Sequence, residues 1–205
     1  VKMMEVSNNT MLGSFFEEEG ESIWYFNAPQ YWIHSHTTGF IPRTDYYEGY
    51  EKDEETGEII LNNFIESKIS THYKQLTFDD IKANVVNGLL NSSLFYWWFV
   101  TWSDGRDLLN SHISNFPINL DDLSEDMVEK IDSLVDELMD SYEENSRERI
   151  NKRTAGYSIK ITEIIPQESK HIIDDIDNVF AQYYDFSEEE IDFIKNFDIE
   201  FRITR

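Results

Sequence analysis

The residues after Ser124 form the strongest amphipathic pattern in the chain. Apolar side chains recur there at the three- and four-residue spacing of one helix face, and carboxylates occupy the opposite face. Ser124 is a suitable N-cap for this helix. An amphipathic helix is stable mainly through packing of its apolar face, so the rest of the chain must supply a core that covers it. The apolar positions are Val128, Ile131, Leu134, Val135, Leu138 and Tyr142.

Beyond this helix the sequence predicts a strand and two more helices. Residues 157–165 alternate apolar and polar side chains, with the period of two that is typical of a strand. Apolar residues then recur at helical spacing from Ile172 to Tyr183. Ser187, followed by Glu190, matches the capping box that begins a further helix.

A short basic cluster lies between the first helix and the predicted strand. Within residues 147–160 the net charge is +4, whereas the whole chain carries −24. One interpretation places these cations at the solvated end of the helix, where positive charge suits the helix dipole. The cluster consists of Arg147, Arg149, Lys152, Arg153 and Lys160, with Glu148 as its single acid.

The first half of the chain predicts strands followed by a helix. Residues 23–43 and 59–76 are rich in Trp, Tyr, Phe and Ile, which favour strands. From Thr77, a candidate capping partner of Asp80, apolar residues follow helical spacing, and the turn signal Asp104-Gly105 should end the helix.

These elements together predict an α+β fold. A strand-containing, aromatic-rich part is expected at residues 1–118, followed by a mostly helical part at residues 119–205 that packs on it. Five consecutive aromatic residues, Phe95 to Phe99, cannot all be buried on one helix face, so some should line a groove or meet another element.

The acidity of the chain is confined to certain regions. The sequence has 41 acidic and 17 basic residues, but residues 20–43 and 62–118 together sum to only −1. A net charge of −24 excludes simple electrostatic binding of nucleic acid unless the near-neutral regions face the phosphates.

Several common kinds of site are absent from the sequence. The chain has no cysteine, which excludes disulfides, thiolate zinc sites and cysteine nucleophiles. No two glycines are two residues apart, so the sequence has no Gly-x-Gly cofactor loop and no Gly-x-Ser-x-Gly elbow. The longest uncharged stretch, between Lys82 and Asp104, is too polar for a membrane span, and no export signal begins the chain. We therefore predict a cytoplasmic protein.

Metal binding has only weak support in the sequence. His34 and His36 are spaced for one strand face, but no third ligand is apparent, and two such histidines more often pack or face solvent. The triplet Glu66-Ser-Lys68 matches the acidic-x-lysine element of metal-dependent nucleases, which also needs an upstream Asp for Mg²⁺. We predict no metal site and keep a nuclease as a minor alternative.

Two segments carry candidate DNA-binding residues. If residues 68–74 form one strand, Lys68, Ser70, His72 and Lys74 share a face with four hydrogen-bond donors, although an ordinary solvent-facing strand has the same pattern. Arg106, in the turn after the aromatic block, suits a phosphate or guanine, and equally a structural clamp on backbone carbonyls.

At these residues the sequence resembles the C-terminal, target-recognition end of adenine-specific (N6) DNA methyltransferases of restriction-modification systems, including fused type IIG restriction-methylation enzymes. The resemblance runs in family order over roughly residues 60–202. Its phrases are Ile69-Ser-Thr-His-Tyr-Lys74, Leu90-Asn-Ser-Ser-Leu-Phe-Tyr-Trp97, Ser103-Asp-Gly-Arg106 with Asn110, Phe116-Pro-Ile118, and a terminal phrase from Ser169-Lys170 to Phe201-Arg202.

The resemblance implies a module that grips double-stranded DNA and selects its sequence, with residues 1–118 as the target-recognition part. A separate N-terminal methyltransferase domain would bind S-adenosylmethionine and flip the adenine. The Asn-Pro-Pro-Tyr motif of that domain is absent here, so we expect a specificity fragment without catalysis or cofactor of its own. By carry-over, the expected DNA-binding residues are Lys68, His72, Lys74, Ser103, Asp104, Arg106 and Asn110.

A different class of function fits the overall charge. With a pI near 4.3, the chain could act as an acidic DNA mimic that inhibits DNA-binding enzymes. A recognition module should bind duplex DNA more weakly as salt rises, whereas a mimic should not bind DNA.

Overall fold

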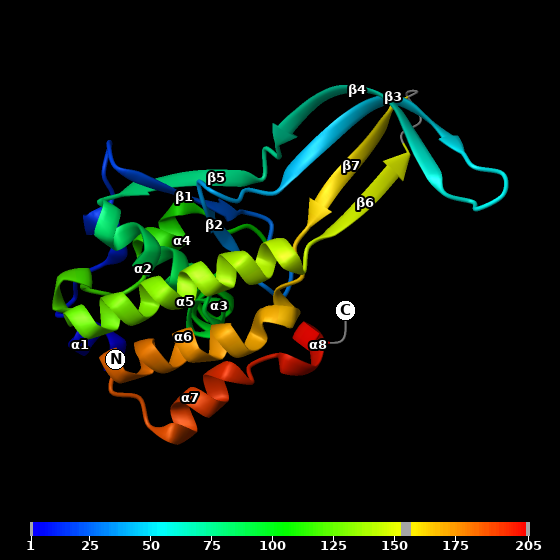
Figure 1. Ribbon diagram of the computed structural model, residues 1–205. Helices are drawn as coiled ribbons and strands as arrows, with labels where there is room; N and C mark the ends of the chain where they lie inside the picture. The colour runs from blue at the N-terminus through cyan, green and yellow to red at the C-terminus, as the bar shows by residue number, and fades with distance from the viewer. Residues whose placement is uncertain (1, 153–156, 204–205) are drawn as a thin grey trace.

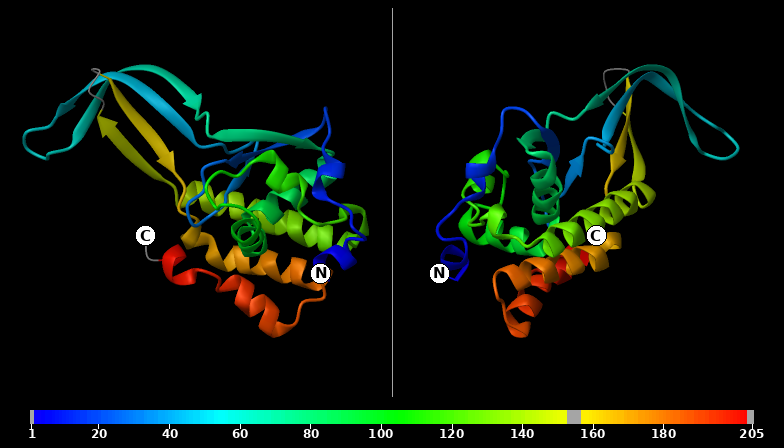
Figure 2. Two further views of the ribbon diagram at one scale, coloured as in Figure 1. Left: turned by 180° about the vertical axis from the view of Figure 1, so that it is seen from behind. Right: turned by 60° about the vertical axis from the view of Figure 1, so that its left-hand side comes forward.

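The computed structural model describes residues 2–152 and 157–203, which form the predicted α+β fold with two antiparallel sheets (Figure 1). A three-stranded sheet lies within a helical body. A four-stranded sheet projects from that body as an arm (Figures 1 and 2). We call residues 43–69, 147–152 and 157–163 the arm and the other described residues the body. No helix among the described residues is long and apolar enough to cross a membrane.

The body sheet consists of β1 (Glu21–Phe26), β2 (Ser35–Thr37) and β5 (Tyr73–Phe78), in the order β2-β1-β5. Both neighbours of β1 run antiparallel to it, with Trp24 opposite His36 on one side and opposite Gln75 on the other. These strands come from the aromatic-rich segments that predicted them, because aromatic side chains pack well on a pleated surface.

The arm sheet is built from two hairpins that are distant in sequence. Strands β3 (Arg43–Lys52) and β4 (Ile59–Ile69) form one hairpin, and β6 (Arg147–Lys152) and β7 (Ser158–Glu163) belong to the other. The order is β4-β3-β7-β6, with β7 pairing antiparallel to β3. The first and second halves of the chain therefore share one sheet, across the boundary expected near residue 118.

Two interpretations of local sequence are wrong in this region. Residues 68–74 are not one strand, because β4 ends at Ile69 and β5 begins at Tyr73 after a turn, so Lys68 belongs to the arm and Lys74 to the body. Arg147 and Arg149 do not cap the preceding helix, which ends at Glu144; they lie on β6. Local propensity predicts neither the end of β4 nor the strand β6, because β4 is defined by its pairing with β3 and β6 by its pairing with β7.

The helix predicted from Thr77 is two helices. Asp79, and not Thr77, caps α2 (Asp80–Asn91), since its carboxylate accepts the backbone N–H groups of Ile81 and Lys82 at 3.1 Å. Ser92 interrupts the helix and caps α3 (Ser93–Trp102), its Oγ accepting the N–H of Phe95 at 3.0 Å. As predicted, α3 stops before Asp104-Gly105.

The three downstream helices are confirmed. Ser124 caps α5 (Glu125–Glu144), α6 spans Lys170–Tyr183, and Ser187 and Glu190 form the capping box of α7 (Glu188–Lys195). The remaining short elements are α1 (Lys2–Val6), η1 (Leu12–Phe15), α4 (Asn110–Ser114), η2 (Leu120–Asp122), η3 (Pro166–Ser169) and α8 (Ile199–Ile203).

One continuous hydrophobic core joins α2 and α3 to α5 and α6. Gly88 of α2 marks the closest approach, because a Cβ built there would lie 3.0 Å from Ile131 Cγ2 and 3.1 Å from Val135 Cγ2 on α5. The apolar face of α5 is thus covered by α2.

The close approach at Gly88 predicts a measurable loss of stability on substitution. We expect Gly88→Leu to lower the free energy of unfolding by about 1–3 kcal/mol, because the larger side chain must separate α2 from α5. Urea denaturation followed by circular dichroism measures the change. A variant as stable as the wild type would show that the two helices are not held this close.

One residue of α8, Arg202, is buried inside the body. The Arg202 guanidinium is buried, with its central carbon 3.9 Å from the centre of the Trp32 ring and 4.9 Å from that of Tyr96. It donates to the Ser93 hydroxyl at 3.2 Å, and the buried Asp177 carboxylate accepts the backbone N–H of Ser93 at 3.2 Å. A buried cation, two aromatic rings and a buried carboxylate therefore hold α8, α3 and α6 together.

Candidate nucleic-acid interface

The arm and the body enclose a hollow of about 670 Å³ where they meet. Its arm side comes from β3, β6 and β7. Its body side comes from the residues that follow β7, from the segment after β1, which includes Pro29 and Tyr31, from the turn before β5, and from α8. The hollow is therefore formed by the angle between the two sheets.

Two arginines project into this hollow from the edge strand of the arm. Arg147 and Arg149 are two residues apart on β6, so the pleat places them on the same face of the sheet, and both line the hollow. The register connects Arg149 to Lys68 across the whole sheet. Arg149 is opposite Ile161 of β7, and Ile161 is opposite Thr44 of β3. Thr44 is in turn opposite Lys68 of β4. Directly opposed residues share a face, so Lys68 lies on the same face of the arm as Arg149.

Arg43 and His72 add to the polar lining at the base of the arm. Arg43 is held in place by Ser67, whose hydroxyl accepts from Nε at 2.9 Å and whose carbonyl accepts from the guanidinium at 3.1 Å. His72 Nδ1 lies 3.1 Å from the side-chain oxygen of Asn27, so this ring is also fixed. Side chains that are positioned beforehand lose less entropy when they bind a ligand.

The hollow is positively charged on a strongly acidic protein. Four arginines and one carboxylate, Glu163, line it, whereas the chain as a whole carries −24. Glu163 lies 3.5 Å from Arg149, and Arg202 is buried beneath the surface. Among the described residues, Arg43 and Arg147 make no ion pair, but Glu163 is the residue directly opposite Arg147 across the sheet.

The structure places the predicted site residues in two adjoining groups. Lys68 stands on the arm, where its ammonium pairs with Glu66 at 2.6 Å and lies over the Tyr46 ring. The pKa of Lys68 is raised, mainly by the hydrogen bond to Glu66. His72 and Lys74 lie on the body side, and the Lys74 ammonium donates to the Thr71 carbonyl at 2.8 Å.

The end of the loop that follows α3 is connected through Asn27 to the turn that contains His72. The Leu108 N–H donates to the Asn27 carbonyl at 2.8 Å, and the Asn27 N–H donates to the His72 carbonyl at 2.8 Å. Asn110 accepts a hydrogen bond from the hydroxyl of the buried Tyr25, which faces Lys74 across the sheet. His72, Lys74 and Asn110 therefore lie near the end of β1, to which Asn27 and Tyr25 connect them.

Three of these loop residues stabilise the fold itself. Ser103 Oγ accepts the Gly105 N–H at 3.0 Å, and the Asp104 carboxylate accepts the Arg106 N–H at 3.1 Å, so both shape the turn. Asn110 anchors Tyr25. The Arg106 side chain is exposed and makes none of the carbonyl contacts that a structural clamp needs within the described residues.

His34 and His36 face each other inside the body, with Nδ1 of His34 2.9 Å from Nε2 of His36. Burial lowers the pKa of His34 to about 4, and it lowers the pKa of the fully buried His36 well below its usual value, with a further contribution from His34. Both rings are therefore neutral at pH 7. The described residues contain no group of three or more His, Asp or Glu side chains that could hold a metal ion.

Sequence reasoning did not single out Arg43 or place Arg147 and Arg149 in a site. Arg43 has no motif around it, and it reaches the hollow only because β3 begins beside the turn that contains His72. The reversal of charge over residues 147–160 was the signal that could have identified the other two.

Comparisons with known proteins give no relative for this chain: no family model matches it, and neither a curated protein nor a solved structure does.

Proposed function

We propose that this protein recognises a specific sequence in double-stranded DNA, as the specificity end of an adenine-N6 DNA methyltransferase or restriction-methylation enzyme. The observation that carries the proposal is the hollow between arm and body, where arginines gather on a chain of net charge −24. Such a charge pattern attracts phosphates to one place and repels them elsewhere.

The proposal assigns different roles to the arm and the body. Arg43, Arg147 and Arg149 bind phosphates and set the orientation of the duplex, because guanidinium groups bind phosphate in a bidentate way. His72, in the turn before β5, and the exposed Arg106 are assigned to base edges. A sheet that protrudes from a body can contact a duplex from two sides.

The parent protein would supply the chemistry. A separate N-terminal methyltransferase domain would bind S-adenosylmethionine and transfer the methyl group, and this chain would act on double-stranded DNA in the cytoplasm without a cofactor of its own. Residues 1–118 would form most of the recognition part, but in this proposal residues 147–163 of the second part add β6 and β7 to it.

Removal of the arm cations should weaken DNA binding and its dependence on salt. We expect Arg147→Ala/Arg149→Ala to lower affinity for a random-sequence duplex about tenfold or more. The slope of log affinity against log salt should fall by about one for each phosphate that is no longer neutralised. Fluorescence anisotropy of a labelled duplex over a salt series measures both quantities.

The matched control is Lys130→Ala, which removes one cation from the exposed, acidic face of α5. This variant should bind DNA as the wild type does. If Lys130→Ala, which removes one cation, lowers log affinity by about half as much as the double arm variant, then only total charge matters and the proposed interface is contradicted.

The same assay on Arg106→Ala should show weaker binding with unchanged thermal unfolding, whereas loss of folding would assign Arg106 to the fold.

One observation favours the acidic DNA mimic as a second candidate. Carboxylates line the solvent face of α5, among them Glu129, Asp132, Asp136 and Asp140, all of them exposed. A mimic would give no anisotropy change with duplex DNA at any salt concentration.

The nuclease alternative has its own test. It would be supported if the protein cuts a plasmid only in the presence of Mg²⁺ and if Glu66→Gln abolishes this cutting.

A further inference from the structure

The hollow between arm and body is too small to contain a DNA duplex. Its volume is about 670 Å³. A sphere of that volume is about 11 Å across, whereas the major groove of B-DNA alone is about 12 Å wide. Pockets that bind one small molecule measure about 300–1,000 Å³. A duplex can therefore lie over the hollow, but only a ligand about the size of a nucleotide can enter it.

Aromatic rings line the body side of the hollow. Tyr31, in the segment after β1, and Phe201 of α8 stack on each other, with ring centres 5.9 Å apart and planes inclined by 16°. Helix α8 lies near the base of the arm (Figure 1). Phe201 is 57% exposed, so part of its ring surface is open to a ligand. Exposed aromatic rings are the usual stacking partners of unpaired bases, because every base has a flat π face.

Guanidinium groups line the arm side of the same hollow. Arg147 and Arg149 come from one face of β6. Arg43 comes from the start of β3, where the Ser67 hydroxyl accepts from its Nε. Glu163, the one carboxylate in the lining within the described chain, pairs with Arg149 and is opposite Arg147. Because guanidinium groups bind phosphate through paired hydrogen bonds, a ligand with a flat ring and a phosphate finds partners on both sides of the hollow.

We propose that the hollow binds one unpaired nucleotide of a DNA strand, with its base on the Phe201 ring and its phosphate on the arginines of the arm. Aromatic rings beside cationic groups are the combination by which proteins hold single strands. The inference rests on the proposed function, because it specifies what enters the same hollow. A duplex offers such a nucleotide where a base leaves the stack, which costs least at a mismatch.

Two DNA probes test this inference separately from the proposed function. One is a short labelled oligothymidine, and the other is a fully paired duplex of the same length, both measured by fluorescence anisotropy. We expect the wild type to bind both. Phe201→Ser should weaken binding of oligothymidine about tenfold, because the base loses its stacking partner, and should leave duplex affinity unchanged. If Phe201→Ser does not fold, Phe201→Leu serves instead, since leucine keeps an apolar side chain without a flat ring.

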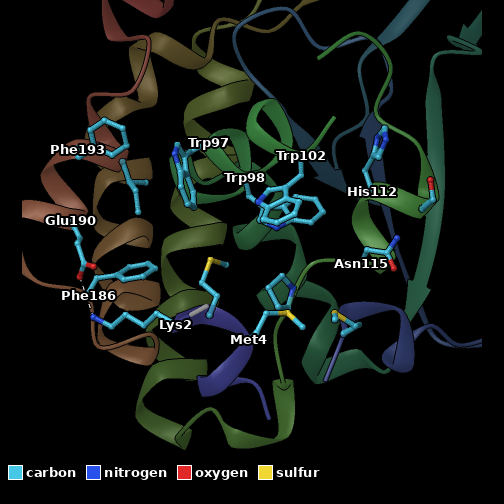
Figure 3. Close-up of a pocket in the computed structure, with 15 residues that line it drawn as sticks. Lys2, Met4, Trp97, Trp98, Trp102, His112, Asn115, Phe186, Glu190 and Phe193 are labelled. Carbon is cyan, nitrogen blue, oxygen red and sulfur yellow. Dashed lines mark hydrogen bonds and ion pairs between the residues drawn. The ribbon is translucent and has the colours of Figure 1, made fainter. Parts of the chain in front are cut away.

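The matched control is Phe193→Ser. Phe193 is also 57% exposed, but it lies on α7 and lines a different pocket, together with Trp97 and Trp98 of the aromatic block (Figure 3). The two pockets share no lining residue. This variant should bind both probes as the wild type does, and a loss of oligothymidine binding equal to that of Phe201→Ser would contradict the assignment of the base to Phe201.

The remaining outcomes distinguish the two proposals. Duplex binding without oligothymidine binding, or full affinity of the Phe201 variant for oligothymidine, would overturn the nucleotide site and leave the proposed function in place. Oligothymidine binding without duplex binding would contradict the proposed function alone. A protein that binds neither probe would contradict both.

Discussion

Replacement of Asp177 by alanine should destabilise this protein severely. We expect Asp177→Ala to lower the free energy of unfolding by about 3–5 kcal/mol at pH 8, because the buried Arg202 would lose the carboxylate that stabilises its charge most. The two backbone N–H groups at the start of α3, of Ser93 and Leu94, would also lose their acceptor. Chemical denaturation measures the loss.

A double-mutant cycle separates the charge effect from simple loss of packing. In Arg202→Met the buried cation is gone, so the further change Asp177→Ala should cost much less than it does in the wild type. Asp177→Asn, which keeps an acceptor of the same shape, should lie between wild type and alanine. Additive effects of the two substitutions would show that Asp177 and Arg202 do not interact.

Acid should weaken the fold through the facing histidines. The pKa of His34 is lowered by burial to about 4, whereas an exposed imidazole titrates near 6.5. Between these pH values the unfolded chain binds a proton that the folded chain does not, so stability present above pH 6.5 is lost as pH falls towards 4. For His34 alone this loss amounts to roughly 2–3 kcal/mol between pH 7.5 and pH 4.5.

The variant His34→Gln isolates this effect, since glutamine does not titrate. Its loss of stability between those two pH values should be smaller than the wild-type loss by roughly 2–3 kcal/mol. Burial raises the pKa of Asp177 to about 6, so this carboxyl group makes the fold more stable, not less, as the pH falls below 6. Because Asp177 is present in both proteins, its contribution cancels in the comparison. His171→Gln, on the exposed face of α6, is the control and should follow the wild type. An unchanged slope in His34→Gln would show that the ring is accessible to protons in the folded state.

The helical half of the fold could be predicted because its signals are local. Each of these signals acts within a few residues of the chain. Ser124 caps α5, as predicted, and the capping box of Ser187 and Glu190 begins α7. The arm could not be predicted in the same way. Its sheet depends on β7 pairing with β3 across more than half of the chain, and no local pattern specifies that pairing.

The candidate site was predictable only in part, for a related reason. His72, Lys74 and Asn110 lie near one another, because Asn27 and Tyr25 connect them to the end of β1. The expected strand face that joined Lys68 to Lys74 does not exist, because the chain turns from one sheet to another between them. Arg43 and Arg149 line the same hollow only because of the order of strands in the arm.

The packing of Arg202 against Trp32 also bears on how the chain folds during synthesis. The Trp32 indole N–H donates to the Arg202 carbonyl across 170 residues of sequence. At about 5–20 residues per second, a ribosome needs roughly 10–30 s to make the intervening chain. The ring of Trp32 must wait that long for the cation that covers it, whereas the start of α3, 109 residues before Arg202, waits roughly 5–20 s. The nascent chain therefore exposes the Trp32 ring until α8 has been translated.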